Sequence, residues 1–317
     1  MSAHTPAAAS DTLDGIVRVN RQGAIAIRLT ALAVMLLPLL GFVEAVRLWM
    51  AGYASATEWT LFGVMYVVHM GGISIGFHRM LSHRAFTTLS AVRVACLIFG
   101  SMAAQGPLLY WVATHRRHHA YSDRPGDPHS PQLFGKDWKS KVAGLWHAHM
   151  PWMLSEEISQ WNYFAKDIIA DRQLLFFHRT YLWWVLLGLA LPAVLGGLIH
   201  DSWTGVWSGF IFGGLARMFL ANQFAWCVGS VCHMFGGRPF ETRDHSTNNW
   251  WVAVLTFGEG LQNNHHAFPW WYRHGVHWWE PDLSGWLLTL LGKLGIVKDL
   301  KSPSADAIRR LRRMTPV

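Results

Sequence analysis

The segment His115-Arg116-Arg117-His118-His119 decides how the rest of this chain is interpreted. On a helix, its i, i+3, i+4 spacing places all three imidazole rings on one face. Gln262-Asn263-Asn264-His265-His266 repeats this spacing, and a further histidine pair lies in His78-Arg79-Met80-Leu81-Ser82-His83. Imidazole nitrogen is the commonest protein ligand for iron, zinc and copper near neutral pH. Three such segments, each ending an apolar stretch, predict one shared metal centre. In chain order we call them the first, second and third histidine boxes.

The first box has a different spacing from the other two. His78 and His83 are five residues apart, so on a regular α-helix their rings would point about 140° apart. The pair fits better where a helix ends and the backbone can bend the second ring back. Soluble di-iron proteins use glutamates with a Glu-x-x-His motif, which does not occur in this sequence. The boxes therefore predict a centre held almost wholly by neutral nitrogen.

The composition is typical of a membrane protein. Of the 317 residues, 51% are hydrophobic and only 15% are charged, whereas soluble domains have roughly a quarter charged. The 19 tryptophans agree with this, because tryptophan gathers at membrane interfaces. The formal charge of +8 does not indicate nucleic-acid binding, because no basic stripe with interleaved aromatic residues is present. The three cysteines lack CxxC spacing, so they indicate neither disulfides nor a thiolate metal site.

Four apolar runs are long enough to cross a bilayer, which needs about 20 residues. We expect an all-α membrane protein in which these runs form four transmembrane helices in two hairpins, at about residues 25–50, 59–77, 181–199 and 203–226. Residues 1–24 are expected to form a short, mobile cytoplasmic tail, and residues 301–317 a basic C-terminal tail. The polar residues 120–179 are expected to form a cytoplasmic helical cap. The basic residues gather on the side of the boxes, and the positive-inside rule makes that side cytoplasmic.

Residues 89–111 could form a fifth span by length alone. Arg93 and the Gln105-Gly106-Pro107 break weaken this interpretation. A crossing here would also put the second box on the opposite side of the membrane from the first, so the two could not share a metal. We therefore expect an amphipathic or buried helix at the interface.

The boxes and their topology resemble the membrane fatty-acyl desaturase family, in particular the stearoyl-CoA (delta-9) desaturases and their bacterial relatives. The resemblance extends over roughly residues 25–300, which would form the desaturase domain. The matching segments, besides the boxes, are Gly76-Phe77, Asp127-Pro128-His129, Cys232-His233-Met234-Phe235-Gly236, Arg238-Pro239-Phe240, Gly258-Glu259-Gly260 and Ala267-Phe268-Pro269.

The resemblance implies two irons and a set of ligands for them. These ligands would be His78, His83, His115, His118, His119, His233, His265 and His266. Spacing alone does not single out His233. Two positions depart from the family pattern. Gln262 stands where a histidine is usual, and it is an additional candidate ligand. Gly229 stands where the family usually has an asparagine that reaches the metal through water.

The implied reaction uses O₂ and two electrons to insert a cis double bond into a saturated acyl chain, with delta-9 as the expected position. The substrate would be a long-chain acyl thioester or a lipid. No haem-binding or iron–sulfur motif occurs in the chain, so a separate ferredoxin-, rubredoxin- or cytochrome-type donor with its reductase is implied.

Side chains that could contact the substrate follow from this scheme. Trp111, Trp146, Trp226 and Phe257 could wall an acyl tunnel, although ordinary membrane packing also explains them. Arg116 and Arg117 could bind a charged head group together with nearby lysines, although the positive-inside bias also explains these cations.

Several other polar residues need an interpretation. Arg217 lies inside the fourth span, where a charge needs a polar partner or a cavity, and His69 is expected to be a hydrogen-bonded core residue. Asp127, Glu259 and Asp244 could orient ligand rings through the free ring N–H.

Two other functions remain open. A related membrane hydroxylase would use similar boxes but insert oxygen. A metal or haem carrier would bind without turnover, but paired haem ligands would lie deep in facing helices, and only His69 is so placed. A double bond, an alcohol or no conversion distinguishes the three.

Overall fold

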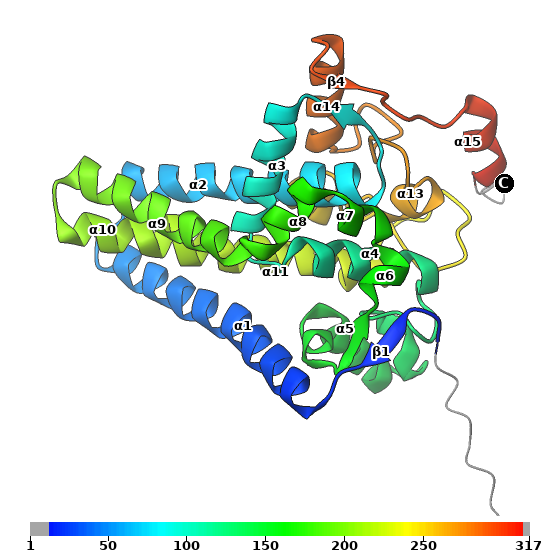
Figure 1. Ribbon diagram of the computed structural model, residues 1–317, viewed down its shortest axis with the longest axis horizontal. Helices are drawn as coiled ribbons and strands as arrows, with labels where there is room; N and C mark the ends of the chain where they lie inside the picture. The colour runs from blue at the N-terminus through cyan, green and yellow to red at the C-terminus, as the bar shows by residue number, and fades with distance from the viewer. Residues whose placement is uncertain (1–12, 313–317) are drawn as a thin grey trace, which may run out of the picture.

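A computed structural model describes residues 13–312 of the chain (Figure 1). The prediction of a mobile N-terminal tail falls, for residues 1–12, outside the described residues. Four helical stretches are long and apolar enough to cross a membrane: Arg21–Met50, Ala56–Ser82, Tyr181–His200 and Trp203–His233. The predicted all-α membrane fold with two hairpins is therefore confirmed; the described part of the chain adds only four very short strands and three isolated β-bridges.

The first hairpin joins α1 (Arg21–Met50) to α2 (Ala56–Gly71), which continues without a break into the π-helix η1 (Gly72–Ser82). The second hairpin joins α9 (Tyr181–His200) to α10 (Trp203–Gly209), η4 (Phe210–Ala216), α11 (Arg217–Gly229) and η5 (Val231–His233). The second and fourth helical stretches extend past the predicted runs at 77 and 226, because the chain stays helical up to the histidines. The candidate ligands His78, His83 and His233 thus stand at the ends of long helices.

Glu58 fixes the end of the bundle that lies far from the boxes. It completes a capping box with Ser55 at the start of α2, which satisfies helix N–H groups that would otherwise lack partners. The buried carboxylate also accepts hydrogen bonds from Ser208 Oγ at 2.8 Å and His200 Nε2 at 2.9 Å. One side chain therefore ties the start of α2 to both helices of the second hairpin.

Small residues let α9 and α10 approach closely. A Cβ atom on Gly209 would lie 2.2 Å from the carbonyl oxygen of Pro192, and one on Gly196 would lie 2.3 Å from that of Gly205. Such contacts are typical of membrane helices, whose backbones pack closely at small residues. The two helices therefore form a rigid pair against which η4 packs.

Residues 89–111 do not form a single span. They form α3 (Ser90–Met102), a break, and α4 (Leu108–Tyr121), with Pro107 directly before α4. The break at residues 103–107 agrees with the predicted Gln105-Gly106-Pro107 interruption. At 13 residues, α3 is too short to cross a bilayer, and it packs against η1 and α9. The prediction that residues 89–111 do not form a fifth span is confirmed, and α3 is an amphipathic helix with one buried face; its position at the membrane interface remains a prediction.

A cap of short elements follows these helices at one end of the bundle (Figure 1). β1 (Ile16–Arg18) pairs antiparallel with β3 (Glu157–Ser159), and β2 (Thr87–Thr88) with β4 (Val297–Lys298). The remaining elements are η2 (Pro131–Phe134), α5 (Trp138–His149), η3 (Pro151–Leu154), α6 (Trp161–Phe164), α7 (Lys166–Ala170), α8 (Arg172–Arg179), α12 (Trp250–Leu255), α13 (Gln262–Ala267), α14 (Leu283–Lys293) and α15 (Ala305–Leu311).

The segment predicted as a basic C-terminal tail folds back on the cap. Its helix α15 brings Ile308 and Leu311 against the buried cluster of Phe240, Phe268 and Trp271. A β-bridge between Phe240 and Arg312 closes this contact. The apolar side chains interleaved with the arginines explain why this stretch packs rather than remaining solvated.

Arg217 is fully buried where three helices meet. Its guanidinium donates to the carbonyls of Gly188 at 2.8 Å and Met102 at 3.2 Å, its Nε donates to that of Gly213, and a terminal nitrogen lies 3.1 Å from His69 Nδ1. Such a charge inside a span needs polar partners, and α9, the end of α3 and α2 supply them. Arg217 therefore links helices, and His69 is the hydrogen-bonded core residue that was expected.

Arg217→Met should lower the thermal unfolding temperature in detergent by several degrees. Each buried carbonyl that loses its donor costs about 1–3 kcal/mol. Arg310→Met, at an exposed position of α15, is the matched control. Equal melting temperatures for both variants and the unmodified chain would contradict the linking role.

Candidate metal centre

The π-helix η1 explains the spacing of the first box. In a π-helix the backbone pairs i with i+5, and the N–H of His83 donates to the carbonyl of His78 at 3.2 Å. Residues five positions apart therefore lie one above the other on the same side of the helix. The ring centroids of His78 and His83 are accordingly only 4.8 Å apart. The divergence of about 140° expected for an α-helix does not occur. The bent helix end that the sequence favoured is a π-helical turn.

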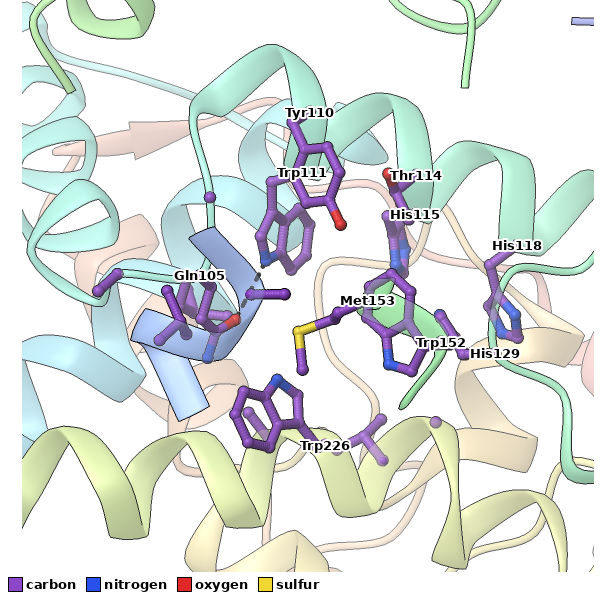
Figure 2. Close-up of a pocket in the computed structure, with 18 of the residues that line it drawn as sticks. Gln105, Tyr110, Trp111, Thr114, His115, His118, His129, Trp152, Met153 and Trp226 are labelled. Atoms are coloured by element: carbon purple, nitrogen blue, oxygen red, sulfur yellow. Dashed lines mark hydrogen bonds between the residues drawn. The ribbon is translucent and has the colours of Figure 1, made fainter. Parts of the chain in front are cut away.

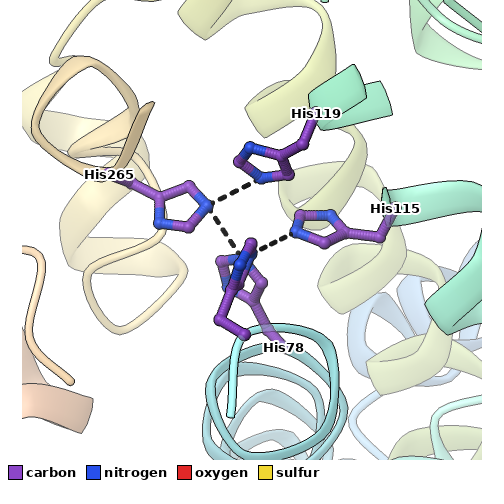
Figure 3. A group of neighbouring side chains, drawn as sticks. His78, His115, His119 and His265 are labelled. Atoms are coloured by element: carbon purple, nitrogen blue, oxygen red, sulfur yellow. Dashed lines mark hydrogen bonds between the residues drawn. The ribbon is translucent and has the colours of Figure 1, made fainter. Parts of the chain in front are cut away.

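Five imidazoles converge from three separate segments. We call them site A: His78 and His83 from the end of η1, His115 and His119 from α4, and His265 from α13. Nε2–Nε2 distances are 2.7 Å for His83–His115, 3.1 Å for His78–His265 and 3.0 Å for His119–His265. Figure 3 shows four of these rings turned toward one another.

Three further imidazoles form site B. They are His118 from α4, His233 from η5 and His266 from α13, and their ligand nitrogens lie within 4.8 Å of one another. The Nε2 atoms of His118 and His233 are buried without a hydrogen-bond partner. All eight histidines implied by the resemblance therefore fall into one of two adjacent groups. Their role as ligands remains a prediction.

Carboxylates hold the site B rings from behind. His118 Nδ1 lies 2.9 Å from Asp127, His233 Nδ1 2.9 Å from Asp123, and His266 Nδ1 2.6 Å from Asp244. A ring that donates its Nδ1–H to a carboxylate keeps its Nε2 lone pair free and fixed in direction. In site A, a carboxylate oxygen of Glu259 lies against His78 Nδ1.

Three of these four carboxylates were expected from the sequence, and Asp123 was not. Burial alone would raise the pKa of the Asp123 carboxyl. The hydrogen bond from His233 and the electrostatic attraction of the same imidazole instead lower this pKa to about 2. Its other oxygen accepts from Ser130. Asp123 follows His119 by four residues in chain order, but no local motif links it to His233, which is 110 residues away.

Burial favours the neutral form of four of the five site A rings. It lowers the pKa of His83, His115, His119 and His265 well below the ordinary value, and neighbouring imidazoles lower it further. Neutral imidazole is the form that offers a lone pair to a metal. Two nitrogens bound at about 2.1 Å and at right angles lie roughly 3 Å apart, close to the measured Nε2 separations. The donor set therefore fits nitrogen-ligated metal ions.

Gln262 lies beside site B. Its amide nitrogen is 3.0 Å from His266 Nε2, while its Oε1 is buried without a partner. Rotation of the amide would exchange the places of its nitrogen and oxygen. Oε1 would then lie beside His266 Nε2 and could bind the same metal ion. The candidate ligand of the third box is thus within reach of the site, and its role remains a prediction.

A cavity of about 380 Å³ borders both sites (Figure 2). Trp111 and Trp226 line it, as predicted for tunnel walls, together with His115 and His118. Trp146 is exposed and lies outside this lining, because its part of α5 faces away from the cavity. Phe257 packs on Tyr66 rather than on the cavity wall.

The two predicted head-group arginines have partners within the protein. Arg116 donates to the carbonyls of Leu81 and Ser82 and forms an ion pair with Asp167. Arg117 donates to Gly126 and pairs with Glu157. Arg116 thereby ties the second box to the end of η1. Substrate contact by either arginine remains a prediction.

Two histidines outside the implied ligand set lie next to the sites. The His274 ring, expected from the sequence to lie in the cap or beside the ligands, is tilted against His265 with centroids 4.4 Å apart, and its Nδ1 lies 3.8 Å from Glu259. His129 stacks on His118 at 4.3 Å. His129 belongs to the matched Asp127-Pro128-His129 segment, which was the only sequence signal for either residue.

Residues 57–283 match the profile of the family described as "Fatty acid desaturase". The chain belongs to the fatty acid desaturase family. Members of this family are oxidoreductases that act on acyl chains, so the chain is an oxidoreductase. The resemblance to desaturases that the sequence indicated is confirmed.

Several relatives in this desaturase family are similar over most of the chain. A hex-5-enoyl-[acyl-carrier protein] acetylenase of Moorena producens (strain JHB) is 43% identical over 86% of this chain and 85% of its own. An sn-1 stearoyl-lipid 9-desaturase of Synechocystis sp. is 37% identical over 77% and 72%. Acyl-CoA desaturase 1 of Saccharomyces cerevisiae is 34% identical over 78% of this chain and 47% of its own.

Asp123→Asn should weaken metal binding at site B by about 10- to 100-fold, the usual effect of losing a partner that orients a ligand ring. Anaerobic titration of the purified chain with Fe²⁺ measures this. Asp137→Asn is the matched control, because that carboxylate only caps α5. An unchanged affinity in Asp123→Asn would show that the carboxylate does not orient His233.

Proposed function

We propose that this chain desaturates fatty acyl chains, inserting a cis double bond at the delta-9 position with O₂ and two electrons at two irons held by sites A and B. The observation that carries the proposal is the cavity. Its wall is mainly apolar, yet it includes His78 and His115 of site A, and His118 of site B together with Gln262. An acyl chain in this space would lie against both groups of ligands.

Different side chains around the cavity have different roles in the proposed reaction. Apolar side chains of α1, α4 and α11 would exclude water and hold the hydrocarbon straight beside the ligands. Trp111 is fixed by donating its Nε1–H to Gln105 at 3.1 Å, and Gln105 donates to Asn222 at 3.0 Å. These bonds keep the indole rigid against the chain. The irons, when bound, would supply the activated oxygen needed to break an unactivated C–H bond, which no side chain does.

The carboxylates behind the rings set the charge and direction of the ligands. Asp123, Asp127 and Asp244 each accept the Nδ1–H of one site B ring. The rings therefore present Nε2 and cannot rotate while substrate enters or leaves. A displaced ring would expose an unpaired buried carboxylate, which is costly.

The double-bond position rests on the resemblance and on relatives named as 9-desaturases. A second candidate is favoured by the acetylenase at 43% identity: formation of a triple bond in a chain that is already unsaturated. The acyl group would be presented as a thioester or a lipid, and the electrons would come from a separate donor protein with its reductase.

The product test is expression of the chain in a host with a compatible donor, followed by fatty-acid profiling with mapping of the double bonds. We expect a new cis-monounsaturated product, and none from His118→Ala, which removes a site B ligand. His178→Ala should retain it, because His178 packs against Trp161 and belongs to neither site. An alcohol product would indicate a hydroxylase, and a product with a triple bond would indicate an acetylenase. No conversion with intact protein and donor would contradict turnover.

We further propose that the cap and both sites face the cytoplasm, and that the turn at Asp201 faces the opposite side. Basic residues concentrate on the cap, as the positive-inside rule requires. In intact cells, a membrane-impermeant maleimide should label Asp201→Cys, and should label Lys139→Cys on α5 only after lysis. Cys96 and Cys232 are buried, whereas Cys227 is half-buried, so both variants are made with Cys227→Ser to limit background labelling. The reverse labelling pattern would overturn this orientation.

A further inference from the structure

The two sites differ in the number of nitrogen ligands. Site A has five imidazoles, whereas site B has three and the amide of Gln262. Both departures from the family pattern, Gln262 and Gly229, fall beside site B. An ion there would therefore have fewer nitrogen donors than its neighbour, unless another side chain contributes.

His129 lies against site B with an unused ring nitrogen. Its ring stacks on His118 at 4.3 Å with an interplanar angle of 26°, and it lines the cavity together with His118 and Gln262. Its Nδ1 is buried without any hydrogen-bond partner. Its backbone N–H donates to Asp127, the carboxylate that also holds His118. A buried ring nitrogen without a partner is costly unless it has a ligand to bind.

Gly229 makes this placement possible. A Cβ atom at position 229 would lie 2.8 Å from His129 Nδ1 and 3.1 Å from its Cε1, closer than side chains pack. Any residue other than glycine would push the imidazole away. Gly229 ends α11, four residues before the site B residue His233. The imidazole of His129 thus fills the space into which a side chain at 229 would project.

We propose that His129 is a further nitrogen ligand of the metal ion at site B, in the place that a side chain at position 229 would otherwise take. The proposal rests on the proposed function only in that site B holds iron. It assigns a compensating role to a histidine outside the three boxes. Gly229 and His129 then act as a pair, with the glycine leaving room for the ring.

The experiment is anaerobic loading of the full-length purified chain with ⁵⁷Fe²⁺, with iron per chain and Mössbauer spectra recorded across the titration. The unmodified chain should bind two irons. His129→Ala should bind the site B iron about tenfold or more weakly and keep the site A iron, which also reports that the variant is folded. His178→Ala, which alters a ring packed on Trp161 outside both sites, is the control and should match the unmodified chain.

A rescue variant and a displacement variant sharpen the test. His129→Ala combined with Gly229→Asn should regain the second iron, because the amide enters the vacated space. Gly229→Ala should weaken iron binding at site B although His129 is still present, because the new Cβ displaces its ring. If His129→Ala does not fold, Gly229→Ala provides the deciding result. Full iron binding with an unaltered Mössbauer spectrum in both His129→Ala and Gly229→Ala would overturn the proposal. An unmodified chain that binds no iron would instead overturn the proposed function.

Discussion

The structure depends on imidazole rings that are buried and held in direction from behind. Each site B ring gives its Nδ1–H to a carboxylate, and the carboxylates come from the loop after α4 and from the segment before α12. Without these bonds a buried ring could rotate, and its Nε2 would not point at a fixed place. The carboxylates also offset the charge that metal ions would bring into a dry site. Each imidazole of site B is thus backed by its own carboxylate.

Glu259 shows how the scaffold and the sites are joined. It contacts His78 Nδ1, and it also pairs with Arg79 at 3.2 Å. Arg79 in turn pairs with Asp282 at 2.8 Å. The Asp282 carboxylate also accepts from the backbone N–H groups of His274, Gly275 and Gly285. A buried pair of this kind is costly to break from one side. The end of the second membrane helix is therefore locked to the loops around the third box.

Much of the fold and most of the candidate site could be predicted from the sequence. The apolar runs, the break before Leu108 and the grouping of the boxes follow from hydropathy and spacing, which are local properties. The pairing of His78 with His83 was anticipated only as a bent helix end, because spacing does not distinguish a π-helix from a frayed terminus. Asp123 and His129 were not assigned, since their partners are set by tertiary contacts. Trp146 was expected at the cavity because the sequence does not show which face of α5 turns inward.

The central claim is that eight imidazoles from distant segments bind two irons side by side. Iron K-edge X-ray absorption on the anaerobically loaded chain, with the iron content measured on the same sample, tests it most directly. The account predicts two irons per chain and a ligand shell dominated by the multiple scattering of imidazole. A single iron, or a shell dominated by carboxylate oxygen, would contradict it.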